Sequence, residues 1–458
     1  MAATWLENRQ FQNACTHTRS EVIALLILVG VLLWPAKTSA QCPVTWAQWT
    51  PATAPSARAA AVAAYDSTRG VAVLFGGYTG SSLGETWEWD GADWTQRTPA
   101  TAPPARNAHA MAYDSARGVT VLFGGRASGF FGDTWEWDGT SWTQRTPATS
   151  PSARQYPVMA YDSARGVTVL FGGTNASWNL VSDTWEWNGT NWTQRTPATS
   201  PSARQAHAAA YDSARGKTVL FGGFGGGTLG DTWEWDGTNW MQRTPAAAPA
   251  ARYYHAMTYD GARGVTTLFG GQASAYFGDT WEWNGTNWTQ RTFAAAPSAR
   301  AYHTMVWGAG AGTMLFGGYG ARYLGDTWQY GPVVRVAQQP VSCTVVSGGD
   351  AGFGITVVST ASDIPIYQWR KDGTPIPGSS GANKAFLRIP SAKPSDAGSY
   401  DCVVTAGACA WVSAPAALAV LGYRADFDGD ADVDMDDFGL FQRCFTGPAI
   451  PANPACSE

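Results

Sequence analysis

The residues with the clearest chemistry lie near the end of the 458-residue chain, between Asp426 and Asp437. Six aspartates occupy positions 1, 3, 5, 7, 9 and 12 of this run: Asp426, Asp428, Asp430, Asp432, Asp434 and Asp437. Carboxylates this close together repel one another unless a cation lies between them. Because Ca²⁺ is a hard cation that takes about six to eight oxygen ligands, the spacing predicts a calcium site.

The acidic run, with the short apolar helix expected after it from Phe438 to Phe445, resembles a dockerin repeat built on an EF-hand-type loop. This resemblance implies a Ca²⁺ cofactor and a cohesin-like scaffold as partner. Three features depart from it: one copy instead of two, Ala431 where a glycine is usual, and Asp437 where EF-hands carry glutamate. The alternative is an acidic, solvated tail.

Catalytic residues are not indicated elsewhere in the sequence. Four histidines each stand three residues after a repeated arginine: His109, His207, His255 and His303. Their equivalent positions favour a structural role, with a ring nitrogen bonded to neighbouring backbone, over a metal cluster. Glutamates also recur at one position, whereas an acid/base pair needs two different environments to separate its pKa values. We therefore assign no catalytic residue.

The elements that surround these residues repeat. Phe-Gly-Gly occurs at six places, separated by 47 to 50 residues: Phe75, Phe123, Phe171, Phe221, Phe269 and Phe316. Each copy predicts four strands, the second a continuous apolar run such as 71–75 and the third an alternating one such as Thr-Trp-Glu-Trp. A fixed period of this length predicts stacked sheets rather than one growing core.

The repeat resembles kelch in its Gly-Gly pair, its tryptophans in strands three and four, and its Pro…Arg-x-x-His run. This implies an all-β fold, a six-bladed kelch-type propeller over residues 41–331. The last copy lacks a fourth-strand tryptophan, and residues 46–58 align with residues 94–106. We therefore expect the N-terminal strand to complete the last blade and leave no open sheet edge.

The most variable loops of the propeller should share one face, because strand direction alternates within a blade. The loops between strands two and three, and those between blades, differ among copies and are rich in aromatic residues. Such loops on a rigid scaffold are typical of a ligand site. The predicted ligand-binding residues are Arg106, Arg154, Arg204, Arg252, Trp178, Tyr254, Tyr276 and Phe131. Alternatively, the loops vary because nothing constrains them, and the arginines brace neighbouring blades.

Residues 332–421 resemble an immunoglobulin-like β-sandwich. Trp369 stands at the strand C position, and Tyr400, two residues before Cys402, stands at the tyrosine-corner position. Residues 355–358 are Ile-Thr-Val-Val, so the usual partner cysteine of strand B is missing. Cys343 could instead reach Cys409 if the first strand runs beside the last. We expect a spacer or adhesion module here, followed by the dockerin-like segment at 422–458.

Composition narrows the class of function. The chain has a net charge of -5 and no basic run, which argues against nucleic-acid binding. Residues 1–40 carry a 13-residue apolar run followed by small residues at 38 and 40, which predicts a cleaved secretory signal and no membrane span afterwards. We expect a secreted or cell-surface binding protein for a glycan or protein. The alternatives are an extracellular carbohydrate-active enzyme and a scaffold-docked subunit.

Overall fold

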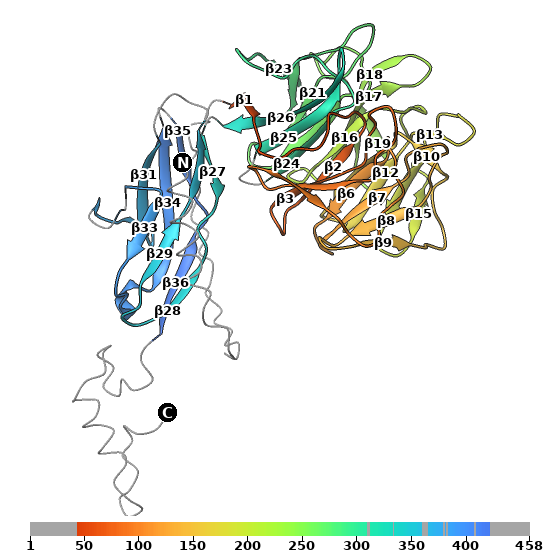
Figure 1. The fold of residues 1–458 in the computed structure, drawn as a ribbon. Helices are drawn as coiled ribbons and strands as arrows, with labels where there is room; N and C mark the ends of the chain where they lie inside the picture. The colour runs from red at the N-terminus through yellow and green to blue at the C-terminus, as the bar shows by residue number, and fades with distance from the viewer. Residues whose placement is uncertain are drawn as a thin grey trace, which may run out of the picture. The chain divides into compact units, whose positions relative to one another are not determined.

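The computed structural model describes residues 44–308, 312–332, 334–359, 365–378, 381, 383–406 and 409–421. The chain forms two compact units, Val44–Pro332 and a unit that includes the residues from Val333 onward (Figure 1). Both are built from strands, and among the described residues the helical turn is η2 (Pro394–Asp396). This agrees with the predicted all-β fold. Within those residues, no helix is long and apolar enough to cross a membrane.

Within Val44–Pro332 the described strands form six four-stranded antiparallel sheets, here called blades. Blades 1 to 3 are β2 (Val62–Asp66), β3 (Val71–Phe75), β4 (Thr86–Trp89) and β5 (Trp94–Arg97); β6 (Ala110–Asp114), β7 (Val119–Phe123), β8 (Thr134–Trp137) and β9 (Trp142–Arg145); and β11 (Val158–Asp162), β12 (Val167–Phe171), β14 (Thr184–Trp187) and β15 (Trp192–Arg195). Blades 4 and 5 are β16 (Ala208–Asp212), β17 (Lys217–Phe224), β18 (Thr228–Trp235) and β19 (Trp240–Arg243); and β20 (Ala256–Asp260), β21 (Val265–Phe269), β22 (Thr280–Trp283) and β23 (Trp288–Arg291). Blade 6 is β24 (Thr304–Gly308), β25 (Gly312–Tyr319), β26 (Tyr323–Pro332) and β1 (Val44–Trp49). In the third repeat, two further short strands, β10 (Arg154–Gln155) and β13 (Thr174–Asn175), pair with each other.

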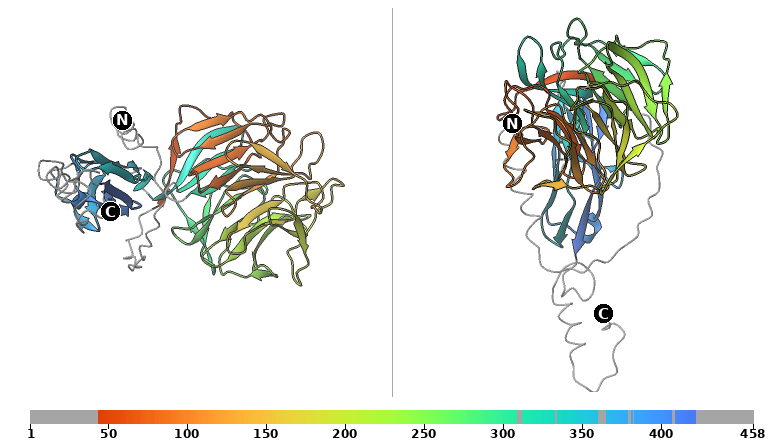
Figure 2. Two further views of the ribbon diagram at one scale, coloured as in Figure 1. Left: turned by 90° about the horizontal axis from the view of Figure 1, so that it is seen from below. Right: turned by 90° about the vertical axis from the view of Figure 1, so that its right-hand side faces the viewer.

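The first strands of the six repeats form a closed circle. β2, β6, β11, β16, β20 and β24 each contact the next, and β24 contacts β2. Figure 2 shows the sheets arranged around this centre. β1 pairs with β26 in antiparallel register, from Val44 opposite Pro332 to Trp49 opposite Thr327. A strand from the start of the unit thus completes the sheet of its last repeat.

A tryptophan in the outermost strand joins each blade to the blade before it. Its indole Nε1 donates a hydrogen bond of 2.9 to 3.0 Å to a threonine hydroxyl. The six pairs are Trp94–Thr327, Trp142–Thr86, Trp192–Thr134, Trp240–Thr184, Trp288–Thr232 and Trp46–Thr280. All six tryptophans are buried. Burying one such ring stabilises the fold by at most about 4–6 kcal/mol.

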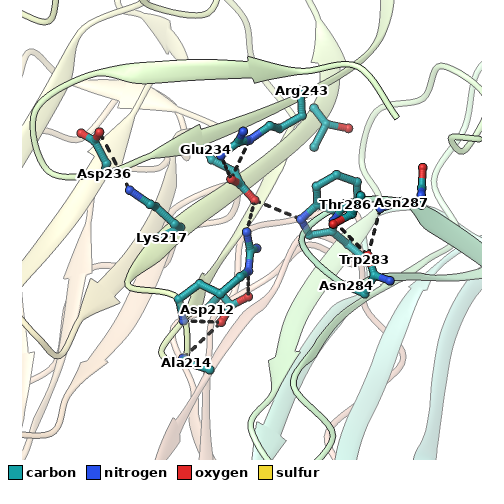
Figure 3. A network of polar contacts seen from close by, with 12 residues as sticks. Asp212, Ala214, Lys217, Glu234, Asp236, Arg243, Trp283, Asn284, Thr286 and Asn287 are labelled. Atoms are coloured by element: carbon teal, nitrogen blue, oxygen red, sulfur yellow. Dashed lines mark hydrogen bonds and ion pairs between the residues drawn. The ribbon is translucent and has the colours of Figure 1, made fainter. Parts of the chain in front are cut away.

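The repeated glutamates carry a second set of contacts between blades. Glu234 is buried, and its carboxylate accepts hydrogen bonds from Arg215 and Arg243 of its own blade. It also accepts one of 3.1 Å from Trp283 of the next blade (Figure 3). The same bond recurs from Trp137 to Glu88, Trp187 to Glu136 and Trp235 to Glu186, and Tyr330 takes this place on Glu282. These carboxylates hold the blades together.

Local turn chemistry follows the sequence closely. In the first repeat, Asp66 Oδ1 accepts hydrogen bonds from the backbone N–H groups of Thr68 and Arg69, and Gly70 has a φ of 72°. An aspartate that accepts bonds from amides ahead of it and a glycine with positive φ are typical of such turns. Gly76 of the Phe-Gly-Gly run also has positive φ, and a Cβ there would lie 2.4 Å from the carbonyl oxygen of Arg106 in the next blade. A side chain at this position would therefore force neighbouring blades apart.

The second unit consists of β27 (Val334–Gln338), β28 (Cys343–Val346), β29 (Ala351–Gly354), β30 (Thr356–Ser359), β31 (Ile366–Lys371), β32 (Thr374–Pro375), β33 (Phe386–Ile389), β34 (Gly398–Ala406), β35 (Cys409–Val412) and β36 (Ala416–Leu421). Its core contains Trp369 of β31, which is fully buried. The Tyr400 hydroxyl donates a 2.6 Å hydrogen bond to the carbonyl oxygen of Asp396, which is the tyrosine-corner geometry.

Cysteine placement in this unit agrees with the missing strand B partner. Cys402 is a free, buried thiol, and Ile355, which lies between β29 and β30, belongs to the same buried core. Burial raises the pKa of the Cys402 thiol to about 12. Cys343 is disulfide-bonded. The side chain of Cys409, its predicted partner, lies outside the described residues, as do the predicted signal at 1–40 and the calcium loop at 426–437.

Candidate functional site

A ring of backbone hydrogen bonds surrounds one end of the central channel. In each blade, the residue two positions after the repeated arginine donates its N–H to the carbonyl oxygen of the equivalent residue in a neighbouring blade. The six residues, all with φ between 51° and 60°, are Ala60, Ala108, Tyr156, Ala206, Tyr254 and Tyr302. A left-handed conformation costs a non-glycine residue about 1–2 kcal/mol. Strain of this kind occurs at functional sites when the surroundings enforce it.

Three of the six ring positions carry tyrosines, and these converge. The rings of Tyr254 and Tyr302 stack with their centroids 3.8 Å apart, and Tyr156 lies edge-on to Tyr254 at 4.9 Å. Burial raises the pKa of all three hydroxyls, so they stay neutral at physiological pH. The alanines in blades 1, 2 and 4 leave the rest of the channel mouth less filled.

A pocket of about 420 Å³ opens beside Ala60 of the ring, and we call it the mouth pocket. Five tyrosines contribute to its wall: Tyr78, Tyr156, Tyr302, Tyr319 and Tyr323. Its polar lining includes Arg126, Asn107 and Ser82. Aromatic walls with a few convergent polar groups are characteristic of ligand sites.

The aromatic surface continues outward from the mouth pocket. Trp178 has a φ of 62° and is 62% exposed. Its ring lies 5.1 Å from that of Phe130, and the guanidinium of Arg126 lies 5.5 Å from its centroid. Tyr276, which is 38% exposed, contacts Tyr319 of the pocket wall. Among the predicted binding residues, Trp178, Tyr254 and Tyr276 therefore belong to this face.

The four arginines predicted as ligand-binding residues are buried. Arg106, Arg154, Arg204 and Arg252 are 0% or 1% exposed. Each guanidinium pairs with an aspartate of its own blade that directly precedes the third strand or, in the case of Asp231, lies within it: Asp133, Asp183, Asp231 and Asp279. Each backbone carbonyl also accepts a hydrogen bond from a glycine of the preceding blade. These contacts brace the loops, and our proposal below does not include the four arginines.

Phe131 supports this bracing. Its ring lies 4.0 Å from the guanidinium carbon of Arg106, and Phe277 holds the same position on Arg252 at 4.1 Å. The ion pairs hold the carboxylates in their charged form. Burial alone would raise the pKa of Asp133, but the hydrogen bonds and charge of Arg106 lower it below its usual value.

The four repeated histidines lie in the channel beneath the tyrosines, around a cavity of about 100 Å³. All are buried, and neither ring nitrogen of His109, His207, His255 or His303 has a hydrogen-bond partner among the described residues. The predicted contact with the backbone is present only as a minor contribution that raises the pKa, from the backbone of Phe171 to His207, of Phe221 to His255 and of Phe269 to His303. Each ring instead packs edge-on against a phenylalanine of the preceding blade, such as Phe75 against His109.

Among the described residues, no group of three or more His, Cys, Asp or Glu side chains is arranged to hold a metal ion. The predicted calcium ligands lie outside them.

Sequence reasoning missed several residues of the mouth pocket. Tyr78, Tyr156, Tyr319, Arg126 and Asn107 were not among the predicted binding residues, although all belong to the variable loops. Their spacing in the sequence could have indicated three of the tyrosines at the channel mouth. Tyr156, Tyr254 and Tyr302 each stand two residues after the repeated arginine. The closed backbone ring that gives this position its meaning is visible only in the structure.

Comparison with known families confirms the two predicted domain types. The model for the KLHDC2/KLHL20/DRC7 Kelch-repeats domain matches residues 86–234 and 168–358, which together span more than half of the chain. The Immunoglobulin domain model matches residues 332–405. No curated protein matches the chain.

Solved structures with similarity to the chain include the titin M3 domain, with 25% identity over 19% of this chain and 96% of that one, at a TM-score of 0.17. The titin z1z2 domains in complex with telethonin show 25% identity over 19% and 47%, at a TM-score of 0.17. The twitchin kinase fragment of C. elegans shows 22% identity over 19% and 20%, also at 0.17.

Proposed function

The chain belongs to the family with the KLHDC2/KLHL20/DRC7 Kelch-repeats domain, and we propose that it is a secreted binding protein that takes its ligand at the channel mouth. Kelch and immunoglobulin domains together suggest a protein-binding, non-enzymatic role. A glycan is the other class of ligand included in the proposal. Secretion is proposed from residues 1–40 alone.

The observation that carries this proposal is the aromatic surface around the mouth pocket. Tyrosine and tryptophan provide large contact areas with little conformational entropy to lose, and they dominate binding energies at interfaces. Here they stand on loops that the backbone ring and the buried ion pairs hold in place. A site on such a scaffold is preorganised, which lowers the cost of binding.

Replacing two exposed aromatic residues of this face tests the proposal. We expect Trp178→Ala combined with Tyr276→Ala to weaken binding about 1,000-fold, because hot-spot aromatics each contribute about 2 kcal/mol or more. The measurement uses the full chain on a printed oligosaccharide array and against a displayed peptide library, followed by affinities for the hits. Tyr254 is left in place because its stacking and left-handed backbone also serve the ring.

The matched control is Met241→Ala, which removes a 52% exposed side chain from the outer strand β19. This variant should bind as the wild type does. Hits that bind the double variant with unchanged affinity would place the ligand elsewhere.

We also propose that the C-terminal segment binds Ca²⁺, on the support of its carboxylate spacing. In calorimetry, the full chain should release or absorb heat on titration with calcium, with a Kd of about 10⁻⁴–10⁻³ M or tighter, as in extracellular modules. Asp426→Asn with Asp428→Asn should remove that signal, because two ligands lose their charge. Identical titrations of the two proteins at millimolar calcium would disprove a site in this loop. A chelator-sensitive pull-down on a cohesin tests scaffold docking separately.

A further inference from the structure

We propose that the mouth pocket binds a carboxylate-bearing sugar, a hexuronic acid unit of an acidic glycan, with Arg126 as the residue that recognises the carboxylate. This inference rests on the proposed function and names the class of ligand. It is drawn from the size of the pocket, from the groups that its wall leaves free, and from the balance of charge around it.

Size and wall chemistry fit a sugar ring. The pocket measures about 420 Å³, within the range of about 300–1,000 Å³ that is usual for small-molecule sites. Its wall presents tyrosines from blades 1, 3 and 6, so aromatic rings approach a ligand from several sides. A pyranose has apolar C–H faces and a polar rim, and therefore suits rings that carry hydroxyl groups.

Backbone groups around the mouth are already used. Ala59 and Asn107 each exchange two backbone hydrogen bonds, with Tyr78 and Arg126 respectively, and Ala301 does so with Tyr319. The N–H groups of Ala60 and Ala108 belong to the ring. A peptide that binds by strand addition needs free main-chain groups at a sheet edge. The groups that can contact a ligand in this pocket are instead the side-chain hydroxyls, the Asn107 amide and the Arg126 guanidinium.

The charge of the pocket is positive. Almost every described arginine of the propeller pairs with a carboxylate, and Arg126 and Arg322 are the two described ones that do not. Arg126 makes a long hydrogen bond of 3.4 Å to Gln155, and its charge acts on the hydroxyls of Tyr156 and Tyr254. None of the described residues that line the pocket is Asp or Glu. An anionic ligand would therefore contact a guanidinium that has no carboxylate partner in the protein. Guanidinium groups bind carboxylates through two parallel hydrogen bonds.

The test compares each acidic sugar with its uncharged counterpart. At pH 7, the full chain should bind tri-galacturonate or tri-glucuronate about 10- to 100-fold more tightly than the corresponding methyl ester, which has nearly the same shape and no charge. Arg126→Gln should abolish this preference, so that the acid and the ester bind the variant with equal affinity. Arg126→Lys should retain part of the preference for the acid, because lysine keeps the positive charge but lacks the planar guanidinium that donates two parallel hydrogen bonds.

Arg322→Gln is the matched control, since this exposed arginine also lacks a carboxylate partner but does not line the pocket. It should keep the full preference, and thermal unfolding of all variants checks that they are folded. Equal affinity for acid and ester, or an Arg126→Gln variant that behaves as the wild type, would overturn the assignment. Preferential binding of a hexaglutamate peptide would also overturn it, while the wider binding function, tested by the Trp178 and Tyr276 variants, would stand.

Discussion

Removing residues up to Thr50 should lower the thermal stability of the propeller severely or prevent its folding. The deletion takes away β1, which pairs with β26 along six residues of each strand. It also removes Trp46, which is 3% exposed, donates a hydrogen bond to Thr280 and packs on Phe269 and Tyr330. The indole alone represents up to about 4–6 kcal/mol of burial. A domain has about 5–15 kcal/mol of net stability.

The comparison requires thermal unfolding of the shortened and intact chains, followed by near-ultraviolet circular dichroism, which reports on packed tryptophans. A chain that begins at residue 44 is the control, because it keeps β1 whole. Trp46→Phe should fall between the two, since it keeps most of the apolar ring and loses the hydrogen bond to Thr280. Equal midpoints for the shortened and intact chains would contradict closure of the circle through β1.

Acidification from pH 7 to pH 5 should destabilise the propeller through its buried histidines. Burial, together with the positive charge of the neighbouring arginine, lowers the pKa of His109, His207 and His303 to about 3. Burial also lowers the pKa of His255, and the charges of Arg252, His207 and His303 act in the same direction. In the unfolded chain a histidine has a pKa of about 6.5, so it takes up a proton that the folded chain excludes.

The direction of the pH effect on stability follows from the difference between the folded and unfolded pKa values. Stability is greatest above pH 6.5 and falls as the pH decreases from about 6.5 towards 3, because only the unfolded chain gains protons in that window. Each of the three histidines should cost about 2 kcal/mol at pH 5. The carboxylates paired with the bracing arginines, such as Asp133, have a lowered pKa and lose their contribution only below about pH 4. Loss between pH 6.5 and 4.5 is therefore due to the histidines.

Urea unfolding at pH 7.5, 6 and 5 measures this effect. Replacing all four histidines by alanine should flatten the dependence above pH 4.5, whatever it does to stability at neutral pH. Alanine is compatible with the backbone because Ala61 occupies the equivalent position in the first repeat. An unaltered slope in the fourfold variant would show that other groups titrate.

Much of the fold could be predicted from the sequence because its determinants are local or periodic. The Asp66-to-Gly70 turn depends on an aspartate that accepts neighbouring N–H groups and on a glycine at positive φ. The second strand of each repeat is a continuous apolar run because it is buried on both faces, as Val73, Leu74 and Phe75 are. The tyrosine corner joins Tyr400 to a residue only four positions earlier.

The candidate site was predicted less well, because its arginines and aromatics look alike in sequence and differ in burial. Arg106 and Arg126 both belong to loops of the same face, yet the first is fully buried against Asp133 and the second lines the mouth pocket without a carboxylate partner. Asp133 lies 27 residues from Arg106, and no local pattern links them. Which guanidinium is free depends on the three-dimensional partners of each.

By itself, the sequence determined the repeat, the strands and turns within it, and the kelch and immunoglobulin identities of the two domains, since each depends on residues close together or at a fixed interval. Only the tertiary structure decided which residues of one repeat contact residues of another. Trp283 reaches a glutamate 49 residues away, and the residue two after each arginine joins a closed backbone ring. Such contacts form when separate repeats meet around an axis, so the tyrosines over the channel and the histidines beneath them have their roles only in the closed circle.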